Sequence, residues 1–165
     1  MKKNDEVQLL ISELKSDMDF IEECYRKNRA MTERIIKNEN ADEFEYSSLG
    51  YTLHNLYNAF ESYFLRIAKF FENNLESSGW HKSLVERMTL EIQGVRIALF
   101  DKDFALRLEE LLKFRHVFRN IYKSPLIPEK ILWINKAVCN ISADFRIYHD
   151  RYCIFLKELA EKLEG

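Results

Sequence analysis

The chain has 165 residues, 47% of them hydrophobic, and a formal net charge of -2. This length and apolar content suit a single domain over residues 1–165 with a real core, and they exclude a disordered chain. The 4 glycines and 2 prolines are too few for the many tight turns of a β-sandwich or barrel, and the near-neutral charge excludes a general nucleic-acid-binding surface.

Apolar residues spaced three and four apart predict two long helices in the first half of the chain. The first covers residues 5–37, and the polar segment that follows it contains the first turn. The second covers 44–75, beginning either there or only after Gly50, and its apolar stripe is unusually aromatic. Each helix is expected to bury one face.

Three further helices are predicted in the second half. A short one covers 80–92, and Asp101 or Asp103 is the expected N-cap of the next. That helix ends before Pro125, because the residue preceding a proline avoids helical geometry. The last begins at Pro128 and continues without a break through residue 159. Its near-3.5 period favours antiparallel packing, so the predicted fold is an all-α bundle of four to five helices.

The sequence shows no membrane span, no signal peptide and no disulfide framework. No apolar run approaches the roughly 18 residues of a membrane span, and the charged first residues do not resemble a signal peptide. Three widely spaced cysteines, Cys24, Cys139 and Cys153, suggest reduced thiols and not a disulfide framework. We therefore expect a cytoplasmic protein that does not contact a membrane.

The segment KFRHVFRNIYKSP, residues 113–125, is the strongest candidate site. Between residues 111 and 128 the chain has four Lys and Arg residues and no Asp or Glu. One interpretation is structural, because each cation at a helix C-terminus complements the helix dipole by about 0.3–1 kcal/mol. The other interpretation is a site that handles an anion.

The facing of these residues on a helix favours the second interpretation. At about 100° per residue, Arg115, Arg119 and Tyr122 fall on one stripe, and His116 and Asn120 fall on the next. Arginine suits bidentate phosphate contacts, and histidine exchanges protons near neutral pH.

These residues also carry a family resemblance. The HEPN superfamily motif is Arg, a polar residue, three residues, His, one residue, Tyr, and the segment from Arg115 and His116 to Tyr122 resembles it, with Asn120 where the histidine is expected. The resemblance is closest to HepT-like toxins of bacterial HEPN/MNT toxin–antitoxin pairs. The segments LHNLYNAFESYFLRIAKFFE and WHKSLVERM also look like parts of HepT-like proteins, so the resemblance covers residues 49–126.

The resemblance implies a metal-independent endoribonuclease that needs no cofactor. Two subunits of a homodimer would form one composite cleft at their interface and cleave RNA, with tRNA as one candidate substrate. Arg115 corresponds to the catalytic arginine, and Arg119 and Lys123 would bind RNA phosphates. The alternatives are a non-catalytic HEPN module that binds a nucleotidyltransferase or a nucleotide, and a plain dimerising bundle with a solvated basic end.

Asn120 departs from the motif, because an amide does not transfer protons near neutral pH although it can hydrogen-bond a phosphate or ribose oxygen. Three explanations remain open. Asn120 is natural in this branch and His116 supplies the acid–base function one turn away; the protein is a binding-only relative; or the asparagine is an inactivating substitution in a toxic ribonuclease.

Tyr122 matches the tyrosine that the cognate MNT nucleotidyltransferase modifies in this family. That antitoxin attaches AMP groups from ATP, so ATP is used by the partner and not by this chain. The added phosphates would lie among Arg115, Arg119 and Lys123 and occupy the RNA phosphate sites. Without the resemblance, a tyrosine whose ring packs at the edge of the core is the simpler interpretation.

The remaining polar candidates are weaker. His54 and His81 could approach the cleft as supporting groups, although a lone helical histidine is more often partly buried and hydrogen-bonded. Glu61 could neutralise nearby cations, and His149 is expected at the surface. No metal is expected, because no spacing of histidines and cysteines fits a metal site.

Overall fold

The computed structural model of the protein describes residues 4–72, 80–121, 123 and 125–164. These ranges contain α-helices and no strand beyond an isolated antiparallel bridge between Ile92 and Arg96, so the all-α prediction is confirmed. The helices are α1 (Asn4–Lys37), α2 (Glu43–Phe71), α3 (Trp80–Met88), α4 (Lys102–Phe118), α5 (Pro128–Ala137) and α6 (Ile141–Glu164).

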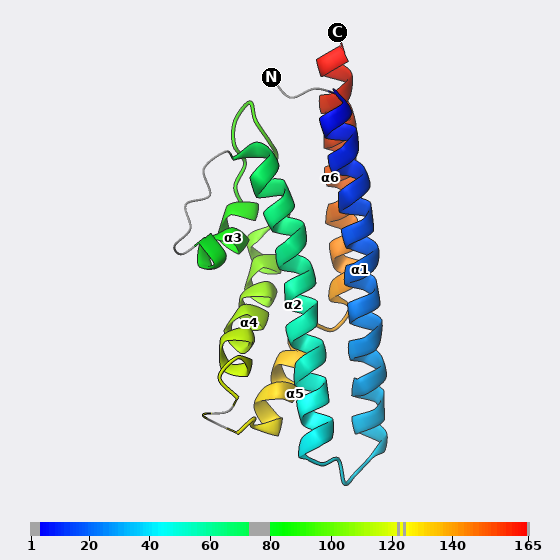
Figure 1. Ribbon diagram of the computed structural model, residues 1–165, viewed down its shortest axis with the longest axis vertical. Helices are drawn as coiled ribbons and strands as arrows, with labels where there is room; N and C mark the ends of the chain where they lie inside the picture. Colours follow the sequence, from blue (N-terminus) through cyan, green and yellow to red (C-terminus); the bar gives the residue numbers. More distant parts are fainter. Residues whose placement is uncertain (1–3, 73–79, 122, 124, 165) are drawn as a thin grey trace.

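The long helices run alternately down and up the molecule (Figure 1). Helix α1 descends, α2 rises beside it, α4 descends along the other side of α2, and α6 rises beside α1. The start of α1 and the end of α6 therefore lie at the same end of the bundle. The short helices α3 and α5 both pack against α2 and α4. This is the predicted antiparallel bundle.

A capping box sets the start of α2. The backbone N–H of Glu45 donates to Asp42 Oδ1 at 3.0 Å, and the N–H of Asp42 donates to Glu45 Oε2 at 3.1 Å. Because these bonds satisfy otherwise unpaired amides of the first turn, α2 begins at Glu43. Of the two predicted starts, the one before Gly50 is therefore confirmed.

Aromatic rings form the centre of the core. Phe60 and Phe64 of α2 meet Phe104 of α4 and Phe145 of α6, and all four are buried. The Phe60 and Phe145 rings meet edge to face, with centroids 5.1 Å apart and an interplanar angle of 84°. This geometry matches the preference of aromatic quadrupoles, so the aromatic stripe of the second predicted helix serves packing.

Two buried amides fix the position of α5. Asn28 Nδ2 of α1 donates to Asn135 Oδ1 of α5 at 2.8 Å and to Thr52 Oγ1 of α2 at 3.0 Å. Asn135 Nδ2 in turn donates to Thr32 Oγ1 at 2.9 Å. Buried polar groups are stabilising only when they are paired, so this network selects one arrangement of the three helices.

The predicted unbroken last helix is wrong. Helix α5 ends at Ala137 and α6 begins at Ile141, and Asn140 between them has a φ of 59°. Asparagine tolerates this left-handed region better than most residues, and the Asn140 N–H donates to Tyr25 Oη at 2.7 Å. The apolar spacing hides the break because Val138 and Ile141, on either side of the turn, are both buried.

The third predicted helix is also shorter than expected, because a buried arginine closes it. Arg96, 2% exposed, donates from Nη2 to the Arg87 carbonyl at 2.9 Å and from Nη1 to the Leu90 carbonyl at 3.0 Å. Its charge is balanced by Glu72 at 3.2 Å. Helix α3 therefore stops at Met88 instead of residue 92.

The predicted surface position of His149 is wrong. The side chain is 2% exposed, and its Nδ1 lies 2.8 Å from the Tyr63 hydroxyl in a hydrogen bond. Burial, reinforced by the charge of Arg146, lowers the pKa of His149. The exposed neighbours Asp150 and Arg151 suggested a surface site, but successive residues of a helix point about 100° apart.

Candidate functional site

Helix α4 carries the basic segment to one end of the bundle. Its N-terminus is fixed by Asp101, whose Oδ1 accepts from the Phe104 N–H at 2.8 Å, so Asp101 is the N-cap and Asp103 is not. That hydrogen bond and one from Tyr148 lower the pKa of the Asp101 carboxyl. The helix ends 17 residues later, at Phe118.

The end of α4 differs from the prediction, which extended the helix to the residue before Pro125. Arg115 lies in the last helical turn and Arg119 is the C-cap. Beyond it, the N–H groups of Asn120 and Lys123 bond to carbonyls three residues back, which is tighter than an α-helix. The predicted helical stripes therefore do not extend beyond Arg119 among the described residues, and Asn120, Ile121 and Lys123 lie in turns.

Arg115 faces α2 and is largely covered. Its Nε donates to Asn58 Oδ1 at 3.3 Å, and its Nη2 lies 3.6 Å from Glu61 Oε1. The guanidinium also lies over the Tyr57 ring, 5.8 Å from the centroid. The Arg115 and Glu61 side chains are each 12% exposed, so the candidate catalytic arginine is held in one orientation at the α2–α4 contact.

His54 joins this arrangement through Asn58. Asn58 Nδ2 and His54 Nε2 lie 3.1 Å apart, and the imidazole packs against the Phe118 ring with centroids 5.3 Å apart. Burial and then the charges of Arg115 and Arg119 lower the pKa of His54. We refer to His54, Asn58 and Arg115 as the polar triad.

The other predicted site residues are exposed: His116, Arg119, Asn120 and Lys123. Asn120 Nδ2 donates to the His116 carbonyl at 2.9 Å, so the amide caps the end of its own helix. This bond joins the Asn120 side chain to the backbone of His116 and leaves the imidazole itself uninvolved. Tyr122, the predicted modification target, lies outside the described residues.

Sequence reasoning missed Asn58 and underestimated His54 and Glu61. The signal was available, because residues 54, 58 and 61 follow the four-then-three spacing of one helical face. Nothing in the sequence showed that this face of α2 meets the end of α4. His81, the other supporting candidate, lies on α3, which is placed beside α2 and α4.

Gly50 brings α2 close to the end of α4. A Cβ at this position would lie 3.2 Å from Phe114 Cζ, 3.2 Å from Phe118 Cε2 and 3.4 Å from Leu126 Cδ1. The aromatic residues that flank Arg115 therefore rest directly on the α2 backbone, which steadies the end of α4.

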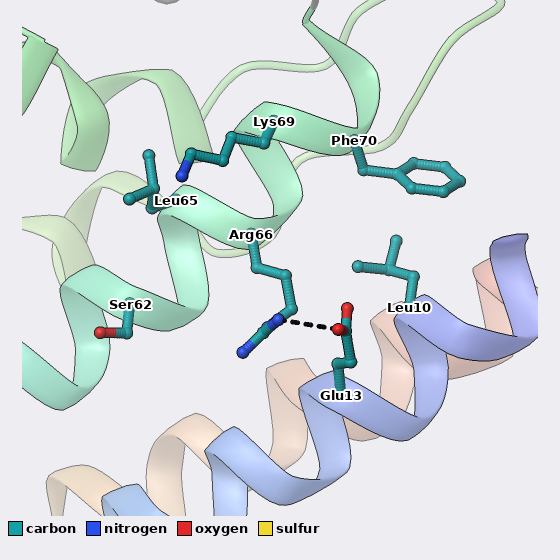
Figure 2. Close-up of a pocket in the computed structure, with 7 residues that line it drawn as sticks. All are labelled: Leu10, Glu13, Ser62, Leu65, Arg66, Lys69 and Phe70. Carbon is teal, nitrogen blue, oxygen red and sulfur yellow. Dashed lines mark ion pairs between the residues drawn. The ribbon is translucent and has the colours of Figure 1, made fainter.

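A hollow of about 480 Å³ lies between α1 and α2, and its lining combines the charged side chains Glu13, Arg66 and Lys69 with Ser62 and apolar side chains (Figure 2). Arg66 projects from α2 across it, and its Nη1 lies 3.1 Å from Glu13 Oε1. Its Nε also donates to Asp17 Oδ2 at 2.7 Å. Because two acids already balance this arginine, the hollow is a weaker candidate for an anion than the end of α4.

No group of three or more His, Cys, Asp or Glu side chains with metal-binding geometry occurs in residues 4–72, 80–121, 123 and 125–164. Within the same ranges, no helix combines the length and the hydropathy needed to cross a bilayer.

Comparison with known proteins identifies a family. A family model described as HepT-like protein matches residues 48–163, which run from within α2 to within α6. No curated protein matches, and no solved structure matches. The match covers more than half of the chain and extends well beyond the segment in which the motifs were recognised.

Proposed function

Because the chain belongs to the HepT-like family, which is related to the HEPN superfamily, we propose that it is the toxin of a bacterial HEPN/MNT toxin–antitoxin pair. It acts in the cytoplasm as a metal-independent endoribonuclease. Two copies form a homodimer, and the α4 ends of both copies contribute to one RNA-cleaving cleft. The cognate nucleotidyltransferase silences the toxin by adding AMP to Tyr122.

The observation that supports this proposal best is the setting of Arg115. A cation held by Asn58 and Glu61 at the edge of an α2–α4 contact is oriented before any ligand arrives. Exposed Arg119 and Lys123 follow it along the chain and add positive charge where RNA phosphates would bind. A solvated helix end needs none of this orientation.

These residue types suit phosphodiester transfer. The ribose 2′-oxygen attacks the adjacent phosphorus, forming the P–O2′ bond, and the P–O5′ bond breaks. A base accepts the 2′-OH proton and an acid protonates the departing 5′-oxygen. Arg115 would stabilise the charge that accumulates on the phosphate oxygens. His116, exposed in the last turn of α4, is the proton-transfer candidate closest to this arginine in the sequence.

Asn120 favours a second candidate function. Its amide already donates to the His116 carbonyl, and it does not replace the proton transfer of the motif histidine. A chain that keeps the arginine and lacks the histidine would bind RNA or a nucleotide, and its nucleotidyltransferase partner, without cleaving RNA.

The deciding experiment is cleavage of end-labelled RNA by the purified chain in EDTA, compared with Asn120→His. We expect the variant to cleave about 100-fold faster than the wild type, because a positioned acid or base contributes on that scale. Asn120→Gln is the matched control, since it keeps an amide at the same position. Intact RNA with Asn120→His, in a folded preparation, would exclude the ribonuclease proposal and favour the binding module.

Modification of Tyr122 has its own test. Co-expression with the cognate nucleotidyltransferase is expected to raise the intact mass by multiples of about 329 Da, one AMP unit less water. Tyr122→Phe is expected to abolish the increase, and Tyr51→Phe, at an exposed position on α2, is expected to leave it unchanged. Continued AMP addition to the Tyr122→Phe chain would show that the target is a different residue.

A further inference from the structure

We propose that neutral His54 is a positioning residue that orients Arg115 through the carboxamide of Asn58, and that adding a second proton to His54 releases this orientation. The inference rests on the proposed function only for the identity of the anion that Arg115 binds. The hydrogen-bond logic of the polar triad stands without it.

The amide orientation of Asn58 follows from the chemistry of its partners. Arg115 has donors only, so the Asn58 atom 3.3 Å from its Nε must be the oxygen. The amide nitrogen of Asn58 is then the atom 3.1 Å from His54 Nε2. Because this nitrogen donates, His54 Nε2 must accept, and the single proton of the neutral ring lies on Nδ1.

A second proton on His54 is incompatible with the hydrogen bonds that link His54, Asn58 and Arg115. In the charged ring Nε2 becomes a donor, so Asn58 must turn its oxygen toward His54 and its nitrogen toward Arg115. That rotation places two donors face to face and removes the acceptor that holds the guanidinium. His54 Nδ1 is buried without a hydrogen-bond partner among the described residues, and leaving this N–H unpaired costs more when the ring is charged than when it is neutral.

The charges around His54 come from two helices. Arg115 and Arg119 of α4 oppose its protonation, and Glu61 of α2 favours it. An anion bound at the arginines would reduce their repulsion, so simple electrostatics predicts tighter anion binding as the pH falls. The polar triad predicts the reverse contribution, because protonation of His54 frees Arg115. Whether His54 strengthens or weakens anion binding as the pH falls therefore distinguishes simple electrostatics from the positioning role.

His54→Gln is the informative variant, because its amide oxygen can accept from Asn58 at every pH. The probe is a fluorescent 2′-O-methyl oligoribonucleotide, which binds but lacks the nucleophile for cleavage. Because burial and the nearby arginines lower the pKa of His54, only part of it is protonated at pH 5.5, and we expect the affinity of the wild type relative to His54→Gln to fall about twofold to fourfold between pH 7.5 and pH 5.5. A ratio that stays constant, or rises at low pH, would overturn the positioning role.

A second measurement does not depend on RNA at all. The titration of His54 is followed by NMR in the wild type, in Asn58→Asp and in Asn55→Asp. A carboxylate at position 58 accepts from both charged His54 and Arg115, so the pKa of His54 is expected to rise above its ordinary value of 6.5. Asn55→Asp adds the same charge on the same helix outside the polar triad and is expected to shift the pKa much less.

The two measurements keep the proposals separable. If the oligonucleotide does not bind at any pH but the titrations are as expected, RNA is not the ligand, and the positioning role of His54 is still supported. If Asn58→Asp and Asn55→Asp shift the pKa of His54 equally, the positioning role of His54 is refuted, whatever ligand the protein binds. Urea midpoints of each variant at pH 7.5 confirm that the chain is folded.

Discussion

Removing the hydroxyl of Tyr63 tests the buried contact that the sequence did not reveal. In Tyr63→Phe the aromatic ring and its edge-to-face contact with Phe145, at 5.0 Å between centroids, are kept. Only the hydrogen bond of 2.8 Å to His149 Nδ1 is lost. Because only one oxygen is removed and the ring stays in place, the change in stability reports mainly the polar interaction.

The structure sets the size of the expected effect. Losing one partner of a buried hydrogen bond costs about 1–3 kcal/mol, since the remaining group is left without water. Cys153 Sγ lies 3.9 Å from the same nitrogen and is a weak replacement partner, so we expect the lower half of that range, about 1–2 kcal/mol. With a slope of about 2 kcal/mol per M urea, the midpoint falls by about 0.5–1 M.

Tyr152→Phe is the matched control for urea unfolding followed by circular dichroism at pH 7.5. Tyr152 is also fully buried, but its hydroxyl has no hydrogen-bond partner among the described residues. Removing that hydroxyl is expected to leave stability unchanged or to raise it. If the two variants shift the midpoint equally, or if Tyr63→Phe does not lower it, the hydrogen bond between Tyr63 and His149 does not stabilise the fold as proposed.

Three further predictions use the same preparation. Burial lowers the pKa of His149 on folding, so the unfolded chain binds more protons at this group below about pH 6.5. The contribution of His149 to stability is therefore complete above that pH and is lost as the pH falls. An unfolding midpoint that does not drop between pH 7 and pH 5 would contradict this. Asn140→Ala places a residue with a Cβ and no local hydrogen-bonding side chain at a φ of 59°, so we expect a loss of about 1 kcal/mol and a melting temperature lower by about 2–4 °C, whereas Asn140→Gly should be near neutral. Cys139 is exposed while Cys24 and Cys153 are buried with raised pKa values, so one thiol per native chain is expected to react rapidly with a maleimide, and Cys139→Ser is expected to abolish that rapid phase.

Much of the fold could be predicted from local patterns. The apolar period predicted α1. The polar segment after it was predicted to contain a turn, and the capping box of Asp42 and Glu45 ends that turn. Residue type and position narrowed the N-cap of α4 to Asp101 or Asp103, and the structure selects Asp101. The helix boundaries that were predicted wrongly depend on partners elsewhere in the chain. Arg96 bonds to carbonyls at the end of α3, and the Tyr25 hydroxyl accepts from the Asn140 N–H at the break before α6.

The candidate site was predicted in part. Arg115 was identified from charge clustering and from the motif, but helix facing placed it on an open stripe beside the apolar face. The structure instead covers it with Asn58 and Glu61, because α2 and α4 pack closely where Gly50 offers no side chain. His54 became a member of the site for the same reason.

The sequence by itself determined the fold class, the family and the position of the basic segment, because these depend on composition, period and order of residues along the chain. Only the tertiary structure decided which cation is oriented and which is free, and which histidine is buried. Those outcomes depend on contacts between residues far apart in the chain, such as Asn58 with Arg115 and Tyr63 with His149. The local pattern of residues does not predict such contacts.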